Sequence, residues 1–174
     1  RIFIPATGVR FPYGLQFFLT IKLFISMNVP YHPLLIHLPI GFIFAALIMH
    51  SIYLFKANWT CRIVSIWLTG FAALFSLLAS ISGQLEYQKA LSKNYSSQII
   101  NILETHKLMG NLLTWILIVF AVVWVNIFFK KMDDRRIDIV AFIILLSITI
   151  GITITSYFGG TLVWVYGVGI KSAI

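Results

Sequence analysis

Charged residues are scarce in this chain of 174 residues. Asp, Glu, Lys and Arg together make up 10% of the sequence, only five residues are acidic, and 60% of all residues are apolar. An average soluble domain has about 25% charged residues, so the composition excludes an ordinary soluble protein. Four stretches without any charge are each long enough to cross the hydrocarbon core of a bilayer: 23–55, 63–85, 108–129 and 139–170.

Several motifs of known chemistry are also missing. The single cysteine, Cys61, excludes an internal disulfide, and the lack of Cys-x-x-Cys-His excludes a covalently attached c-type haem. The sequence has no glycine-rich phosphate loop, no His-Glu-x-x-His motif and no nucleophile elbow. The four uncharged stretches contain no carboxylate, which argues against a proton-coupled transporter. We therefore expect a binding or accessory protein rather than an enzyme.

The four uncharged stretches predict an all-α fold, an integral membrane four-helix bundle. Helices satisfy all their backbone hydrogen bonds within lipid, and about 20 residues at 1.5 Å rise cross the bilayer. We place the helices near 34–55, 63–83, 108–129 and 138–160. No internal repeat in the sequence is strong enough to support an argument.

The first 26 residues are set apart from this transmembrane domain, which covers 27–174. The chain begins with Arg1, and Met27 stands directly before the first histidine motif. Residues 8–12, Gly-Val-Arg-Phe-Pro, match the translation of a sequence resembling the T-arm of a transfer-RNA gene. We therefore predict that residues 1–26 are not native and that translation starts at Met27. The alternative is a short signal-like or amphipathic lead-in.

The net charge of +8 does not indicate nucleic-acid binding, because the basic residues stand at helix ends and in short loops. Two of these loops share one side of the membrane and carry six positive charges: Lys56, Arg62, Lys130, Lys131, Arg135 and Arg136. The positive-inside rule then predicts a multi-pass protein with both termini outside. Asp133, Asp134 and Asp138 alternate with arginines there, which is typical of a solvated turn.

Three histidines are predicted to meet near the outer ends of the helices. His32 and His37 lie in Tyr-His-Pro-Leu-Leu-Ile-His-Leu-Pro, and His106 lies where the third span begins. The first and third helices run in the same direction, so these histidines share one level, to which residues 159–169 return. An imidazole in lipid is costly unless it binds a proton, a metal or a partner, so it is a functional candidate.

Glycines follow two of these histidines by one helical turn. Gly41 stands four residues after His37, and Gly110 stands four residues after His106. Small residues at these positions leave room for a flat macrocycle, although they also allow close helix packing. We predict one b-type haem held by His37 and His106 as metal ligands. His32 would be an alternative ligand or support the site.

The remaining histidine is not part of this prediction. His50 lies thirteen residues after His37, about 20 Å deeper in the membrane at 1.5 Å rise per residue. A second haem at that level would need a second imidazole, and the sequence has none there. We interpret His50 as a snorkelling or hydrogen-bonded bystander near the cytoplasmic boundary.

The motifs in 31–39, the single histidine before the third helix, and Gly-Gly-x-Leu-Val-x-x-x-Gly-Val-Gly resemble a bacterial membrane family, domain of unknown function 2231. The resemblance covers about 30–170. It implies a four-helix domain of the bacterial inner membrane, sometimes joined to cytochrome c or Rieske iron–sulfur modules, and thus an electron-transfer setting. The fourth histidine of the family pattern is replaced here by Tyr166, which makes a second haem doubtful.

Three functions remain open from the sequence. The first is a haem b protein that passes electrons between the quinone pool or an outer cytochrome or iron–sulfur carrier and a partner. Tyr166 would then line the edge of the haem pocket. The second is a non-haem protein in which the imidazoles hold copper, zinc or a quinone head group. The third is an accessory or structural subunit, in which His32, His37 and Tyr166 form a buried hydrogen-bond network.

Overall fold

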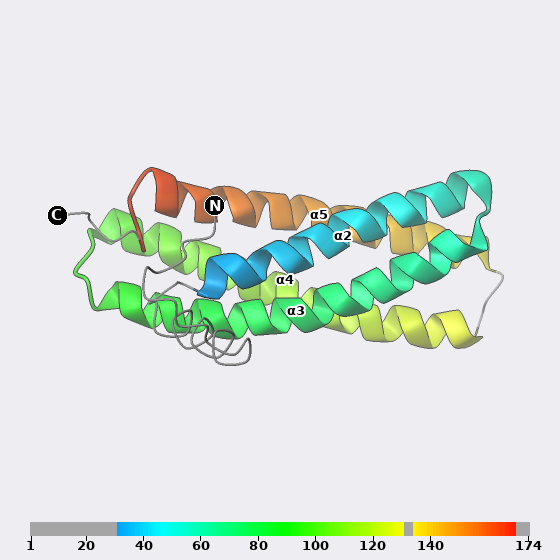
Figure 1. Cartoon of the computed structure of the whole chain (residues 1–174), viewed down its shortest axis with the longest axis horizontal. Helices are drawn as coiled ribbons and strands as arrows, with labels where there is room; N and C mark the ends of the chain where they lie inside the picture. Colours follow the sequence, from blue (N-terminus) through cyan, green and yellow to red (C-terminus); the bar gives the residue numbers. More distant parts are fainter. Residues whose placement is uncertain (1–30, 131–133, 170–174) are drawn as a thin grey trace, which may run out of the picture. The chain divides into compact units, whose positions relative to one another are not determined.

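The computed structural model describes residues 31–130 and 134–169 of the chain. These residues form four long helices joined by short loops (Figure 1): α2 (Tyr31–Lys56), α3 (Trp59–Leu91), α4 (Ser97–Lys130) and α5 (Arg135–Trp164). Each helix is long and apolar enough to cross a membrane. The predicted all-α membrane bundle is confirmed. The predicted N-terminal extension, residues 1–26, lies outside the described residues.

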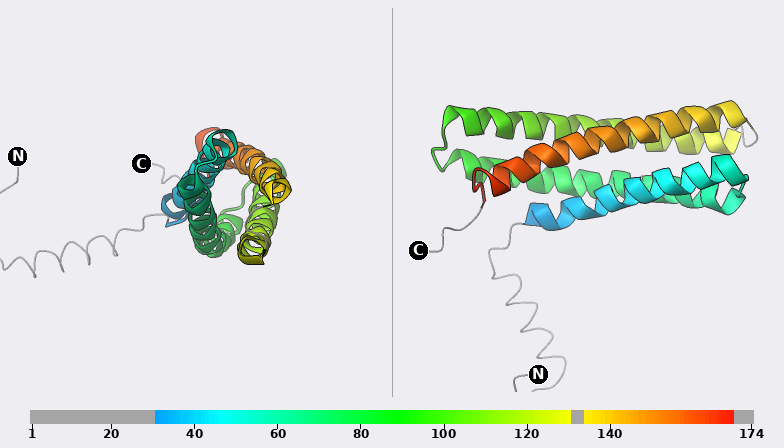
Figure 2. Two further views of the ribbon diagram at one scale, coloured as in Figure 1. Left: turned by 90° about the vertical axis from the view of Figure 1, so that its right-hand side faces the viewer. Right: turned by 90° about the horizontal axis from the view of Figure 1, so that it is seen from above.

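The helices form a closed ring in chain order. Each packs against the helix before and after it, and α5 packs against α2, so that α2 faces α4 diagonally and α3 faces α5 (Figure 2). Neighbouring helices are antiparallel. We call the end where α2 and α4 begin the histidine end, because His32 and His106 lie there. The opposite end, which carries Arg62 and Asp138, is called the ion-pair end.

The helices extend beyond the apolar runs of the sequence. Asn58 caps α3 by accepting a hydrogen bond from the backbone N–H of Cys61 at 3.3 Å, so that α3 begins four residues before the predicted span. Asp134 caps α5 in the same way through the N–H of Arg136 at 3.0 Å. At the histidine end α4 already begins at Ser97, because Leu103 is buried in a small cluster with Ala90 and Leu162.

A larger apolar cluster fills the middle of the bundle. Its fully buried members come from all four helices, with Ile43 on α2, Ala72 on α3, Leu117 on α4 and Leu145 on α5. Most other large apolar side chains point outward, as expected where lipid is the solvent. The middle of the bundle therefore has apolar residues both in its core and on most of its outer surface.

The two hairpins, α2–α3 and α4–α5, repeat the same pattern of buried positions. Arg62 on α3 and Asp138 on α5 are separated by 76 residues. The same offset relates further buried positions of the two helices: Ser65 to Ala141, Thr69 to Leu145, Ala72 to Ile148, Ala73 to Thr149, and Ala79 to Thr155. A second constant offset relates α2 to α4: His32 to His106, Ile43 to Leu117, Ala46 to Phe120, and His50 to Trp124. The bundle is thus an internal structural repeat of one helical hairpin.

Candidate functional site

His32 and His106 face each other at the histidine end. The centres of their imidazole rings are 6.4 Å apart, and the ring planes are nearly perpendicular, at 79°. The two residues occupy equivalent positions of the repeat, on the diagonal helices α2 and α4. The site therefore lies between the two hairpins rather than within either of them.

Each imidazole donates a hydrogen bond to a backbone carbonyl of the neighbouring helix. The Nδ1 atom of His32 lies 2.9 Å from the carbonyl oxygen of Ala79, and the Nδ1 atom of His106 lies 3.0 Å from that of Thr155. A carbonyl oxygen only accepts, so Nδ1 carries a proton in both rings. In a neutral imidazole the lone pair is then on Nε2. A carbonyl bonded to one ring nitrogen, with the other nitrogen left to bind, is the usual arrangement of a metal-ligating histidine.

The two rings are also packed against glycines at equivalent positions. A Cβ atom on Gly83 of α3 would lie 2.9 Å from the Cε1 atom of His32. A Cβ atom on Gly159 of α5 would lie 3.0 Å from the Cε1 atom of His106. Each glycine follows the carbonyl acceptor, Ala79 or Thr155, by one helical turn. Gly83 was not among the predicted site residues, and Gly159 was noted only as part of the glycine-rich motif that ends the fourth span.

His37 lies elsewhere on α2. Its side chain is exposed, and its Nδ1 atom donates within the same helix to the carbonyl oxygen of Pro33. Gly41, the predicted partner of His37, is also exposed, and Gly110 is half-buried. A Cβ atom on either glycine would have no other atom within 4 Å. The structure therefore brings together His32 and His106, and not His37.

Tyr166 lies in the turn that follows α5. Its hydroxyl oxygen accepts a hydrogen bond from the side chain of Gln98, at 3.4 Å, near the start of α4. Gly167 turns the chain with a φ of 65°, and the N–H of Val168 then donates to the carbonyl oxygen of Leu162 at 2.9 Å. Tyr166 thus ties the end of α5 to α4.

The ion-pair end differs from the sequence prediction. Asp138, predicted to lie in a solvated turn, is 1% exposed and accepts from the Nε atom of Arg62 at 2.8 Å. Arg62, predicted to be a loop residue, is fully buried in α3. Its guanidinium lies between three aromatic rings, 5.4 Å from the centre of Tyr53, 5.0 Å from Trp59 and 4.9 Å from Phe128. These rings and the carboxylate compensate for the lost hydration.

His50 belongs to this buried network and is hydrogen-bonded rather than snorkelling. It is fully buried, and its Nε2 atom lies 2.9 Å from the backbone carbonyl oxygen of Asp138. Its Nδ1 atom lies 3.3 Å from the hydroxyl of Ser65. Its ring meets Trp124, the equivalent residue of the second hairpin, at 5.0 Å between centres. Both ring nitrogens have protein partners, so His50 serves to join α2, α3 and α5.

A family model describes the chain as a whole. The model of the predicted membrane protein family DUF2231 matches residues 28–172. The chain belongs to this family. The DUF2231 match covers all four helices and both ends of the bundle. No curated protein and no solved structure shows significant similarity to the chain.

Proposed function

We propose that this DUF2231 protein binds one b-type haem through His32 and His106 and acts as an electron-transfer subunit. The observation that supports the proposal is the pair of facing imidazoles at 6.4 Å. A metal ion about 2 Å from one nitrogen of each of two opposed imidazoles sets the ring centres roughly 6 Å apart. The spacing of the two rings fits a metal between them.

The donor set favours haem over a bare metal ion. Within the described part of the chain, no group of three His, Cys, Asp or Glu side chains is placed to hold a metal. Structural zinc sites use four protein ligands and catalytic ones use three. A haem brings four nitrogens of its own and needs only two axial ligands, which matches two imidazoles.

The residues of the site would have separate roles. His32 and His106 would bind the iron through Nε2, and the carbonyl oxygens of Ala79 and Thr155 would fix the orientation of the rings. A bound haem supplies a one-electron redox centre. The carbonyl acceptors make the imidazoles more basic, and more basic imidazoles would favour the oxidised form of a bound haem.

The location of the site indicates what it would exchange electrons with. We infer that the histidine end faces the outside of the bacterial inner membrane and that both termini lie there, because the basic residues Lys56, Lys130, Arg135 and Arg136 lie at the other end. Partners would then be the quinone pool and an outer cytochrome or iron–sulfur carrier.

A structural role is the second candidate, and the same hydrogen bonds favour it. His32 ties α2 to α3, and His106 ties α4 to α5, without any cofactor. In that case the chain would be an accessory subunit, and the imidazoles would only hold each hairpin closed.

An absorption spectrum separates the two functions. The protein is purified in mild detergent from haem-replete cells and recorded oxidised and after reduction with dithionite. A Soret band that sharpens and a split visible band on reduction are expected for wild type. His32→Ala and His106→Ala should each remove this spectrum, whereas His37→Ala, a change of an exposed histidine, should leave it intact. If the wild-type protein gives no pyridine-haemochrome signal, the haem proposal is wrong and the structural role remains.

A further inference from the structure

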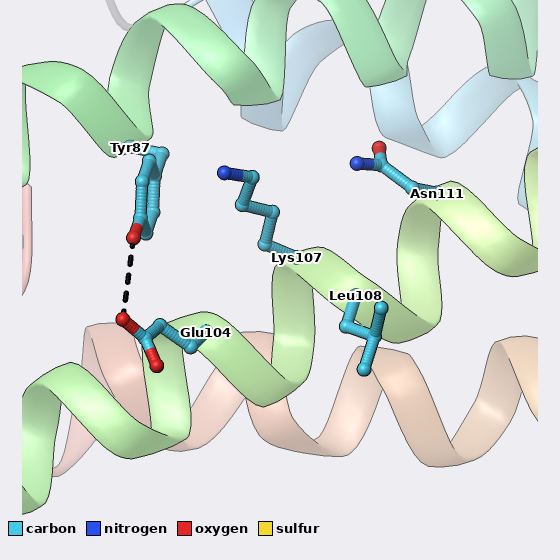
Figure 3. Close-up of a pocket in the computed structure, with 5 residues that line it drawn as sticks. All are labelled: Tyr87, Glu104, Lys107, Leu108 and Asn111. Carbon is cyan, nitrogen blue, oxygen red and sulfur yellow. Dashed lines mark hydrogen bonds between the residues drawn. The ribbon is translucent and has the colours of Figure 1, made fainter.

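A pocket of about 300 Å³ lies between α3 and α4 at the histidine end, and the proposed haem site does not use it. It is lined by Tyr87, Glu104, Lys107, Leu108 and Asn111 (Figure 3). Lys107 directly follows His106 in the sequence. Asn111 accepts a hydrogen bond from the hydroxyl of Ser80, the residue after the carbonyl acceptor of His32. The pocket thus lies on α3 and α4 at about the level of the two imidazoles along the helices.

Two hydrogen-bond donors point into this pocket. The ammonium of Lys107 lies 3.9 Å from the centre of the Tyr87 ring and forms no ion pair with a described residue. The side-chain oxygen of Asn111 is occupied by Ser80 at 2.8 Å, which leaves its amide nitrogen as a donor. Figure 3 shows this nitrogen turned toward Lys107. Both groups can donate to an acceptor oxygen bound in the pocket.

The other walls are aromatic, apolar and acidic. The Tyr87 ring and Leu108 supply flat and apolar surfaces. The carboxylate of Glu104 accepts from the Tyr87 hydroxyl at 3.5 Å and retains capacity to accept another bond. A fully anionic group, such as a lipid phosphate, would be repelled by this carboxylate. A ring with one acceptor oxygen and one hydroxyl at its opposite edges would satisfy all these groups.

We propose that this pocket binds the head group of a membrane quinone or quinol. One ring oxygen accepts from Lys107 and Asn111, and the opposite hydroxyl of a quinol donates to Glu104. Leu108 and Leu112, which are 70% and 58% exposed, continue the apolar surface along which the isoprenoid tail lies. The choice of a quinone among rings of this polarity rests on the proposed electron-transfer function.

Binding of a short-tail benzoquinone to the purified full chain tests the proposal. We expect saturable binding by isothermal titration calorimetry. Lys107→Met and Asn111→Leu should each weaken it about tenfold, the loss expected for one hydrogen bond to a charged or buried donor. Lys89→Met is the matched control, because Lys89 pairs with Glu86 and does not line the pocket. It should leave the affinity unchanged.

The outcomes of this experiment are independent of the haem test. His106→Ala should remove the haem spectrum but leave benzoquinone binding within a few-fold of wild type. Absence of saturable binding, or equal weakening by Lys89→Met and Lys107→Met, would overturn the quinone proposal while leaving the haem proposal intact. If wild type binds no benzoquinone but copurifies with an anionic phospholipid that Lys107→Met loses, the pocket is a lipid site. This result would also overturn the quinone proposal. Elution of each variant at the wild-type volume in size exclusion confirms folding.

Discussion

Arg62 and Asp138 occupy equivalent positions of the two hairpins and form an ion pair with each other across the bundle. Their side chains meet at 2.8 Å and are 0% and 1% exposed. Two other equivalent pairs meet in the same way, His50 with Trp124 and His32 with His106. The residues that face each other across the repeat therefore form both polar centres of the bundle, one at each end.

The first prediction concerns the stability contributed by this ion pair. Arg62→Met leaves Asp138 buried without its cation, so it should lower the free energy of unfolding by about 3–5 kcal/mol. Denaturation with sodium dodecyl sulfate, followed by circular dichroism, measures the change. Lys89→Met is the control, because its ion pair with Glu86 is exposed and should contribute at most about 1 kcal/mol.

The double variant Arg62→Met with Asp138→Leu extends this test. Removing both charges also removes their desolvation cost, so the double variant should be more stable than Arg62→Met alone. Equal or greater destabilisation of the double variant would show that the ion pair has no such coupling. The two experiments together measure the interaction rather than the loss of one side chain.

The second prediction concerns the hydroxyl of Tyr53. It donates to the second carboxylate oxygen of Asp138 at 2.8 Å. Tyr53→Phe keeps the ring against Arg62 but removes this bond, and should cost about 1.5–3 kcal/mol, as for a hydrogen bond to a charged group. Tyr157→Phe changes a tyrosine that is 73% exposed and should have no measurable effect in the same denaturation assay. Equal effects of the two changes would show that the hydrogen bond from Tyr53 to Asp138 does not stabilise the fold.

The third prediction compares the glycines that pack against the imidazoles in the structure with those that were predicted from the sequence to lie at the site. Gly83→Ala and Gly159→Ala place a methyl group 2.9 Å and 3.0 Å from an imidazole, so each should displace the ring and shift or remove the haem spectrum. Gly41→Ala and Gly110→Ala meet no atom within 4 Å. They should keep the spectrum and raise helix stability by about 0.5–1 kcal/mol. Loss of the spectrum in Gly41→Ala but not in Gly83→Ala would favour His37 as the ligand.

The fourth prediction concerns the orientation of the two imidazoles. Perpendicular axial rings leave the two relevant iron orbitals close in energy, whereas parallel rings separate them. The 79° between His32 and His106 therefore predicts a highly anisotropic low-spin signal in electron paramagnetic resonance of the oxidised protein. A rhombic signal with three well-resolved features would show that the rings are closer to parallel when haem is bound.

The four membrane spans were predictable because an uncharged, apolar stretch of more than about 20 residues is rarely anything other than a transmembrane helix. Which of His32 and His37 lies near His106 was not predictable from the sequence. The two residues lie on different sides of α2, and the sequence does not reveal which side faces the bundle, because the lipid-facing side is apolar as well. The position of His106 at the beginning of the third span could be read from the sequence, because it is the single histidine there.

The buried ion pair was missed for a different reason. Arg62 and Asp138 each stand within a few residues of a loop, where charged side chains are usually solvated. Their contact joins residues 76 positions apart. The repeat would have indicated it, since Arg62 precedes Gly83 by the same distance as Asp138 precedes Gly159. Few equivalent residues are identical, so the repeat became apparent only from the buried positions.

The presence of both hairpins in one chain has a consequence for the charges on the axis between them. Two identical hairpins that formed a symmetric dimer would place the same residue on both sides of that axis, and two arginines or two aspartates would repel each other there. Covalent connection allows the two sides to differ. The histidine end still has a histidine on both sides, as a symmetric dimer would, whereas the ion-pair end has an arginine facing an aspartate, which two identical hairpins related by that axis cannot provide.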